Sequence, residues 1–176
     1  MVVRVTAVIL LLLGARTVLG QEQLKLRPSP LAIVSIRYKD NYLKVTYSQP
    51  QKKNRQIFGE LVPFGKVWRT GANEATEFTT IHDIQIDSIV LKAGTYSIFT
   101  IPEKEKWTII LNTEVGLWGA YNYNEQKDLY RFEVPVKATE MIYEPFTIIF
   151  DHRNEVADLL MLWDKTKVSI PIKFIN

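Results

Sequence analysis

The sequence predicts an all-β protein: a single-domain antiparallel β-sandwich or flattened barrel with one or two short helical turns. Several short segments alternate between apolar and polar residues, which is the period of a half-buried strand. Turn-forming residues separate these segments, and no segment has a helical period long enough to connect parallel strands. About nine or ten short strands without crossover helices favour antiparallel sheets.

The individual strands are predicted from alternation or from runs of apolar and β-branched residues. In chain order, the clearest cover residues 43–47, 94–101, 107–111, 130–136, 146–150, 159–163 and 168–174. Turn signals lie between strands at residues 40–41, 92–94, 103–106, 151–154 and 164–167. We expect one short helical turn at residues 55–61.

The first twenty residues have the pattern of a signal peptide. Arg4 precedes an apolar run at residues 5–13, and Gly14 and Arg16 end that run before the roughly 20 residues that a transmembrane helix needs. We expect cleavage after Gly20, export to the periplasm or the medium, and one β-rich domain over residues 21–176. A retained membrane anchor is the alternative.

Composition argues against several classes of function. There is no cysteine, so the chain has no disulfide, no thiolate metal site and no thiol nucleophile. The net charge of +3 falls to about +1 without Arg4 and Arg16, and no basic patch is interleaved with aromatic residues, so we expect no nucleic-acid partner.

Metal and nucleophile motifs are also weak. The two histidines, His82 and His152, lie far apart beside turns, and no calcium-loop motif is present, so we expect no metal and no other cofactor. There is no Gly-x-Ser-x-Gly motif. A Ser-His-Asp arrangement needs only spatial proximity, so the sequence leaves it open.

Residues 58–77 form the most informative segment, because they combine three glycines and a proline with polar residues. Arginine offers a planar set of donors that suits carboxylate, phosphate or sulfate, and tryptophan offers an apolar surface for a sugar ring. The candidate ligand-binding residues in and beside this segment are Arg55, Trp68, Arg69, Asn73, Glu74 and Glu77. The alternative is a structural role, with a buried Arg69–Glu74 bridge and Trp68 in the core.

A second aromatic cluster comprises Trp118, Tyr121 and Tyr123, on a segment that also contains Gly119. Exposed aromatic side chains on such a segment suit sugar stacking or a protein interface. They are also common at the rim of a sandwich. Trp107 and Trp163 lie in apolar runs, and we expect them in the core.

Several motifs are similar in residue type and order to those of a known family. They are Tyr47-Ser48-x-Pro50, Arg55-x-Ile57-Phe58-Gly59-x-Leu61-Val62-Pro63, Trp68-Arg69-Thr70-Gly71-Ala72-Asn73-Glu74-x-Thr76, Ala93-Gly94-Thr95-Tyr96-Ser97 and Trp118-Gly119. The chain resembles the domain-of-unknown-function 2911 family of exported bacterial proteins. The resemblance implies export, a single β-rich domain and a shared site, and it implies no substrate.

The chain departs from the family pattern at two positions. Gln49 stands where the family usually has arginine, and Asn54 stands where it often has glycine. If the missing arginine belongs to a ligand clamp in the family, the site in this chain is weaker or altered.

Three hypotheses follow for the function. The first is an exported β-sandwich module that binds a small anionic or carbohydrate ligand. The second is a hydrolase or isomerase that uses Glu74 or Glu77 as general base while Arg69 holds an anion. The third is a purely structural or interaction domain. The sequence identifies neither a substrate nor a protein partner.

Overall fold

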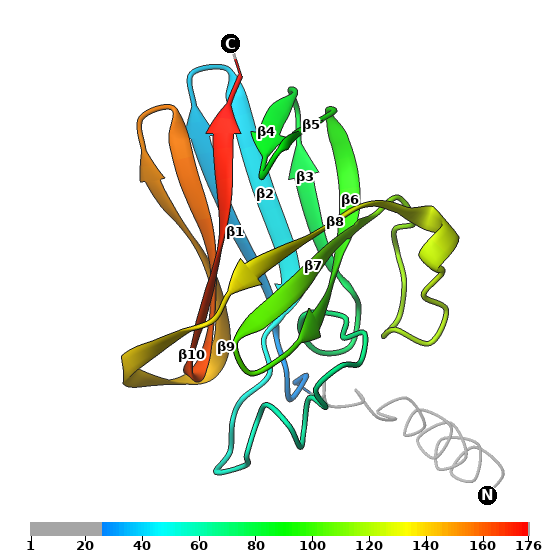
Figure 1. Cartoon of the computed structure of the whole chain (residues 1–176), viewed down its shortest axis with the longest axis vertical. Helices are drawn as coiled ribbons and strands as arrows, with labels where there is room; N and C mark the ends of the chain where they lie inside the picture. Colours follow the sequence, from blue (N-terminus) through cyan, green and yellow to red (C-terminus); the bar gives the residue numbers. More distant parts are fainter. Residues whose placement is uncertain (1–25, 176) are drawn as a thin grey trace, which may run out of the picture.

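The computed structural model describes residues 26–175, which form two antiparallel β-sheets packed face to face (Figure 1). The predicted signal peptide, residues 1–20, lies outside the described residues. The strands are β1 (Leu31–Tyr38), β2 (Asn41–Ser48), β3 (Thr76–Thr80), β4 (Ile84–Ile86), β5 (Ile89–Leu91), β6 (Gly94–Pro102), β7 (Lys106–Asn112), β8 (Asp128–Pro135), β9 (Lys137–Arg153) and β10 (Val156–Phe174). A 3-10 turn, η1 (Glu125–Lys127), precedes β8.

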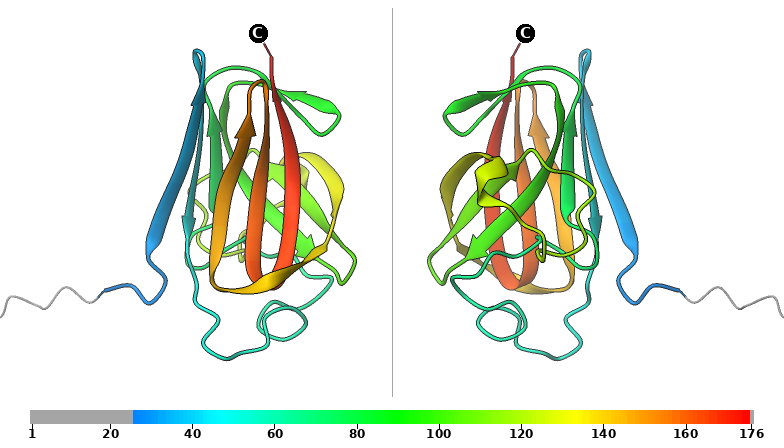
Figure 2. Two further views of the ribbon diagram at one scale, coloured as in Figure 1. Left: turned by 90° about the vertical axis from the view of Figure 1, so that its left-hand side faces the viewer. Right: turned by 90° about the vertical axis from the view of Figure 1, so that its right-hand side faces the viewer.

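The two sheets differ in size. The larger sheet has the strand order β1-β2-β3-β6-β7-β8, and the smaller sheet has the order β5-β4-β10-β9. Most neighbours also follow one another in the chain, so short turns suffice to connect antiparallel pairs. Figure 2 shows the sandwich from two opposite sides. The predicted β-sandwich is confirmed, and the flattened barrel is not formed because the two sheets do not close into one.

The chain of β10 reverses direction at Asp164, where φ is +54°. Residues 156–167 of β10 pair with β9, with register shifts on both sides of Asp164, and residues 172–174 pair with β4. The amide of Phe174 donates to the carbonyl of Glu155 at 2.8 Å, so the two ends of β10 lie side by side. The turn signal at residues 164–167 therefore marks a real reversal, and Figure 2 shows the two arms as adjacent strands.

The core forms where the apolar positions of both sheets face each other. In β2, Leu43, Val45 and Tyr47 are buried, whereas the residues between them are partly exposed, as the alternation predicts. Trp107 and Trp163 are almost fully buried in the same cluster, which confirms their expected place in the core. Each large apolar side chain buried in this way stabilises the fold by about 1.5–3 kcal/mol.

The predicted helical turn at residues 55–61 is wrong. That segment forms tight turns and a short bridge between Phe58 and Val62. The backbone takes positive φ at Asn54 (+56°) and Gly59 (+95°), and a right-handed helix does not admit such angles. Among residues 26–175 the helical structure is limited to η1, where the Asn124 side chain accepts from the amide of Gln126.

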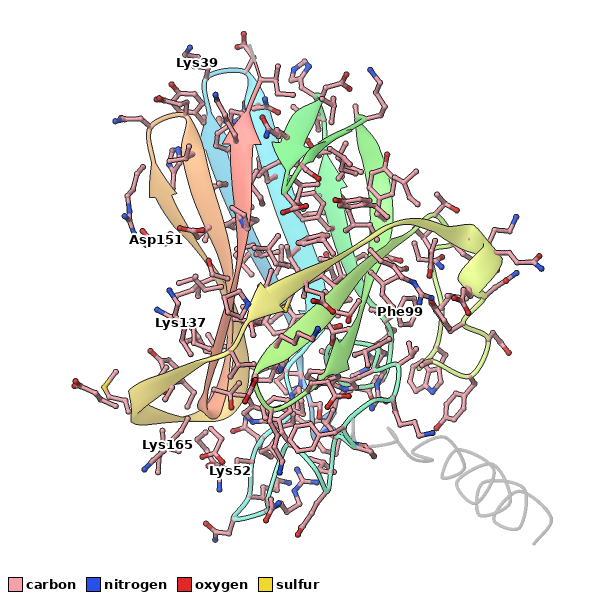
Figure 3. All side chains as sticks on the ribbon, viewed as in Figure 1. Lys39, Lys52, Phe99, Lys137, Asp151 and Lys165 are labelled. Atoms are coloured by element: carbon pink, nitrogen blue, oxygen red, sulfur yellow. The ribbon has the colours of Figure 1, made fainter. Side chains whose placement is uncertain are left out.

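Two long loops position the candidate residues. The motif loop, residues 49–75, connects β2 to β3 at the end of the sandwich opposite the C-terminus, and Lys52 marks this end in Figure 3. The aromatic loop, residues 113–124, follows β7 and covers the outer face of the larger sheet. There Phe99 and Ile110 pack with Leu117 from the loop, and Figure 3 labels Phe99 beside it.

No helix in the part of the chain that the structure describes has the length and apolar character required to cross a membrane.

Candidate functional site

Trp68 anchors the motif loop in the aromatic end of the core. The residue is 8% exposed, and its ring stacks on Trp163 at 5.9 Å between centroids and contacts Phe58, Trp107 and Phe146 edge-on. Its indole N–H donates to the carbonyl of Gly71 at 3.0 Å, so the buried polar atom has a partner. Trp68 is therefore a core residue and not an open stacking surface.

Backbone bonds fix the residues on both sides of Trp68. The amide and carbonyl of Trp68 bond to the carbonyl and amide of Thr100 in β6, at 2.7 and 2.9 Å. The Thr76 hydroxyl donates to the carbonyl of Thr70 at 2.6 Å. A Cβ at Gly71 would lie 2.9 Å from the carbonyl oxygen of Ser48, which explains glycine at this position. The loop thus holds Arg69 in a defined place.

Arg69 is a half-buried cation without an anionic partner. Within residues 26–175 its guanidinium has no ion pair and no hydrogen bond to a protein acceptor, and its buried Nε atom is unpartnered. Burial lowers the pKa of the Arg69 guanidinium, and its electrostatic interaction with Tyr121 opposes this effect. Burying a charge without a partner is unfavourable, so such an arrangement is unusual unless a ligand supplies the anion.

Glu74 is paired with Arg27 and not with Arg69. The Arg27 guanidinium donates to Oε1 of Glu74 at 2.7 Å, and the Ser48 hydroxyl donates to Oε2 at 2.9 Å. Burial acts to raise the pKa of Glu74, but hydrogen bonds from its own backbone, Arg27 and Ser48 bring the pKa below its ordinary value. The internal Arg69–Glu74 bridge considered from the sequence is therefore not formed among the described residues.

Asn73 and Glu77 also have structural contacts. The Asn73 side-chain amide donates to the carbonyl of Ser29 at 3.3 Å, and its backbone carbonyl accepts from Gly119 at 2.8 Å. Glu77, on β3, accepts from the amide of Gly116 at 2.8 Å. Asn73 therefore connects the motif loop to the segment before β1 and to the aromatic loop. Glu77 connects β3 to the aromatic loop.

A pocket of about 300 Å³ opens beside this network. Four of the six candidate residues line it: Arg55, Trp68, Arg69 and Asn73. The Arg55 guanidinium also donates to the backbone carbonyls of Lys52 and Gln51, which holds the side chain against its own loop. Glu74 and Glu77 do not line the pocket. The structure thus brings the cationic and amide candidates together and leaves the two glutamates outside.

Sequence reasoning missed several residues of the site. Those that line the pocket are Ser29, Pro50, Leu61, Val62 and Trp163, and those that hold Glu74 are Arg27 and Ser48. Ser48 and Pro50 belong to the Tyr-Ser-x-Pro motif, and this motif could have indicated that they are part of the site. Arg27 lies 47 positions before Glu74 in a segment without a motif, so no local pattern links them.

The three residues of the aromatic cluster, Trp118, Tyr121 and Tyr123, differ in their burial and contacts. Tyr123 packs on Phe99 at 4.9 Å between ring centroids, and its hydroxyl donates to the carboxylate of Asp128, which is also bonded by Arg131 and Asn112. Burial and the bond to Asp128 raise the pKa of Tyr123 to about 12. By contrast, Trp118 is 56% exposed and Tyr121 is 84% exposed. Tyr123 therefore anchors the loop, and the other two project from it.

A larger hollow of about 460 Å³ lies on the outer face of the smaller sheet and against the end of β8. Its charges compensate one another: Asp151 pairs with Arg153, and Asp158 accepts from the Ser169 hydroxyl at 2.9 Å. Because it contains acids and bases in similar number and mutual contacts, it offers a weaker case for a charged ligand than the pocket at Arg69.

The two histidines lie outside the pocket at Arg69. His152 bonds through Nε2 to the carbonyl of Asn154 at 2.7 Å and contacts the rings of Tyr38 and Phe174. His82 accepts a hydrogen bond from Thr80 through its backbone carbonyl. Across the described residues no cluster of three or more histidine, aspartate or glutamate side chains is arranged to hold a metal ion.

The candidate site lies within the part of the chain that a known family model matches. The family model described as "Protein of unknown function (DUF2911)" matches residues 29–172, which include the motif loop, the aromatic loop and nearly all strands of both sheets. The chain belongs to this family. No curated protein and no solved structure matches the chain significantly.

The structure also shows the surroundings of Gln49 and Asn54, the two positions at which the sequence was expected to differ from the family. The side chain of Gln49 donates to the Tyr47 hydroxyl at 3.3 Å and does not line the pocket at Arg69. Asn54 has φ of +56°, a conformation that glycine and asparagine adopt most readily.

Proposed function

We propose that this protein is an exported binding module that holds the anionic group of a small ligand at Arg69. The observation that carries the proposal is the half-buried guanidinium of Arg69, which has no anion beside it among the described residues. A ligand carboxylate, phosphate or sulfate would supply that anion. Arginine recognises such groups through two parallel hydrogen bonds.

The surroundings of Arg69 support a small ligand. The pocket volume of about 300 Å³ is at the lower end of the range for ligand sites. Arg55 and Asn73 contribute polar groups, whereas Trp163, Leu61 and Val62 contribute apolar surface. Such a mixture binds a charged group at one point and excludes water from the rest of the ligand.

Binding is favoured over hydrolase or isomerase activity because the proposed general bases have other contacts. Glu74 accepts from Arg27 and Ser48, and Glu77 accepts from Gly116. A general base needs to reach the proton that it removes, and neither carboxylate lines the pocket. A purely structural role explains these two glutamates well, but it does not explain an unpaired Arg69.

Export is part of the proposal and rests on the leader pattern of residues 1–20 and on the family pattern. The test is cell fractionation of the full chain in a bacterial host, with the mass of the mature protein determined. We expect a periplasmic or secreted product that begins at Gln21. A product that retains residues 1–20 in the membrane fraction would show that the leader is an anchor.

The binding proposal is tested by thermal unfolding of residues 21–176 with acetate, benzoate, phosphate or sulfate at constant ionic strength. A ligand that prefers the folded state raises the melting temperature. Arg69→Gln removes the cation, and Arg37→Gln, on β1 outside the pocket, is the matched control. We expect at least one anion to stabilise the parent and Arg37→Gln but not Arg69→Gln.

The comparison with Arg69→Gln is required because sulfate and phosphate stabilise most proteins without binding them. Equal stabilisation of all three proteins would mean that the anions act in this general way. That result, or no stabilisation by any anion, would overturn the proposal.

A further inference from the structure

Two exposed aromatic side chains, Trp118 and Tyr121, lie on the loop that borders the Arg69 pocket. Trp118 is the one exposed tryptophan of the four in the chain, and Tyr121 is more exposed still. Neither ring stacks on another aromatic ring among the described residues, in contrast to Tyr123 on the same loop. Their faces are therefore open to a ligand.

Backbone contacts place these two residues beside the pocket. Trp118 forms a β-bridge with Glu74, and the Gly119 amide donates to the carbonyl of Asn73, which lines the pocket. Tyr121 lies close enough to Arg69 to interact with its charge. The aromatic surface and the unpaired cation are thus parts of one continuous region.

The aromatic loop is held at several points, so the rings are presented from a stable base. Ala75 donates to the carbonyl of Leu117 at 2.9 Å, and Gly116 donates to Glu77. Near the end of the loop, the Tyr123 hydroxyl is bonded to Asp128. A loop fixed in this way loses little conformational entropy when a ligand binds.

We propose that the ligand is an acidic oligosaccharide, with the carboxylate of one sugar at Arg69 and neighbouring sugar rings on Trp118 and Tyr121. This inference rests on the proposed function, because it assigns the anion at Arg69 to a carboxylated sugar. The C–H face of a sugar ring packs on an aromatic face, and its hydroxyls bond to nearby polar groups. The polar side chains that line the pocket here include those of Asn73 and Arg55, both of which also bond to the protein.

The polar surroundings favour a sugar over a protein partner. Glu74 and Asn73 bond to the backbone of the aromatic loop, Arg27 is paired with Glu74, and Arg69 has no anion beside it among the described residues. Protein interfaces are instead depleted of charged residues at their centre. Leu31 and Ile33 on β1 are also exposed, so self-association has to be measured in the same experiment.

The test uses residues 21–176 with galacturonic acid, its trimer, and the neutral trimer of galactose as the uncharged counterpart. Affinity is measured by calorimetry. Acrylamide quenching of tryptophan fluorescence gives a second readout, because Trp68, Trp107 and Trp163 are buried and the quenchable signal comes from Trp118. The variants are Arg69→Gln, Trp118→Ala and Tyr121→Ala, with Tyr42→Ala as the matched aromatic control on β2.

We expect the affinity for the acidic trimer to be at least about tenfold higher than the affinity for the monomer. We also expect the bound trimer to protect Trp118 from quenching by acrylamide. Trp118→Ala and Tyr121→Ala should each weaken trimer binding by up to about tenfold and leave monomer binding unchanged. Arg69→Gln should abolish binding of both acids, and Tyr42→Ala should bind like the parent. The neutral trimer should bind at least tenfold more weakly than the acidic trimer.

The failures of the two proposals are distinguishable. If small anions bind through Arg69 but the acidic trimer binds no better than the monomer, the oligosaccharide inference is overturned and the proposed function stands. If Arg69→Gln leaves every interaction unchanged, both are overturned. If the parent forms dimers that Trp118→Ala or Tyr121→Ala dissociates, the aromatic surface is a protein interface, which also overturns the inference.

Discussion

Arg69 and Glu74, five positions apart in the motif loop, differ in whether their charges have partners. The guanidinium is half-buried, its pKa is lowered by burial, and none of the described residues offers it a carboxylate. Removal of one partner of a buried ion pair would cost about 3–5 kcal/mol, because the other charge would be left unpaired. Arg69 has no such partner, so its removal leaves no stranded charge.

We therefore predict that Arg69→Gln changes the free energy of unfolding by no more than about 1 kcal/mol. The measurement is urea unfolding of the variant beside the parent and Arg37→Gln. A loss of about 3 kcal/mol or more would mean that Arg69 is part of the architecture and would weaken the binding proposal.

Glu74 leads to a different prediction, because its carboxylate has two side-chain partners. Hydrogen bonds hold its pKa below the ordinary value, so the folded state prefers the charged form. The resulting stability is fully present above the ordinary glutamate pKa of about 4.3 and is lost as the pH falls through the lower pKa of the folded protein. Both partners are partly exposed to water, which screens the interaction.

We expect Glu74→Gln to lower the stability by at most about 1 kcal/mol at pH 7. The difference from the parent should shrink as the pH falls below about 4, and it should also shrink at high salt. Urea unfolding between pH 3 and pH 7 measures it. A difference that does not change with pH would show that Glu74 contributes through packing alone.

At the level of elements, the aromatic loop depends on glycines with positive φ. Gly116 (φ +73°) and Gly119 (φ +69°) share this backbone conformation but differ in their surroundings. A Cβ at Gly116 meets nothing within 4 Å, whereas a Cβ at Gly119 would lie 2.7 Å from the ring of Tyr121. Substitution at Gly116 therefore tests backbone strain alone, whereas substitution at Gly119 tests backbone strain together with contact with the Tyr121 ring.

We predict that Gly116→Ala and Gly119→Ala each lower the stability by about 1–3 kcal/mol, the usual cost of this conformation for a residue with a side chain. Only Gly119→Ala should move the Tyr121 ring, which is exposed and free to turn away. Urea unfolding tests the first part, and nuclear Overhauser contacts between residue 119 and the Tyr121 ring test the second. An unchanged ring position in Gly119→Ala would contradict the prediction.

The whole molecule is a sandwich whose aromatic core extends to the end that carries the pocket. Trp68 and Trp163 both belong to the core and line the pocket at Arg69, so the pocket shares these two rings with the aromatic part of the core. A site on such a base is largely preformed. This arrangement suits binding with little conformational change.

We predict that residues 21–176 fold as a monomeric-size domain without the leader. The far-UV circular dichroism spectrum should be dominated by β-structure, with helix below about a fifth of the residues, far under the usual third. Sedimentation or size-exclusion chromatography gives the size. A spectrum dominated by helix, or a product recovered solely in aggregates or membranes, would contradict this prediction.

The fold was largely predictable because its signals are local. Alternation in residues 43–47 and 168–174 depends on which face of a strand is buried, and this pattern is visible in the sequence itself. The turn signals at residues 40–41 and 164–167 likewise coincide with real reversals. The helical turn at residues 55–61 failed because propensity does not reveal the positive φ angles that the surrounding loop imposes.

The sequence also determined which residue types are available to the site, because glycines, a tryptophan and two arginines gather around one segment. Only the tertiary structure decided how they are paired. Arg27 reaches Glu74 from 47 positions away, so Arg69 is left without an anion. Long-range packing also buries Trp68 against Trp163 and leaves Trp118 and Tyr121 in water. Unlike the alternation of a strand, the burial of loop side chains and the pairing of charges depend on neighbours distant in the chain, so a local sequence pattern does not show them.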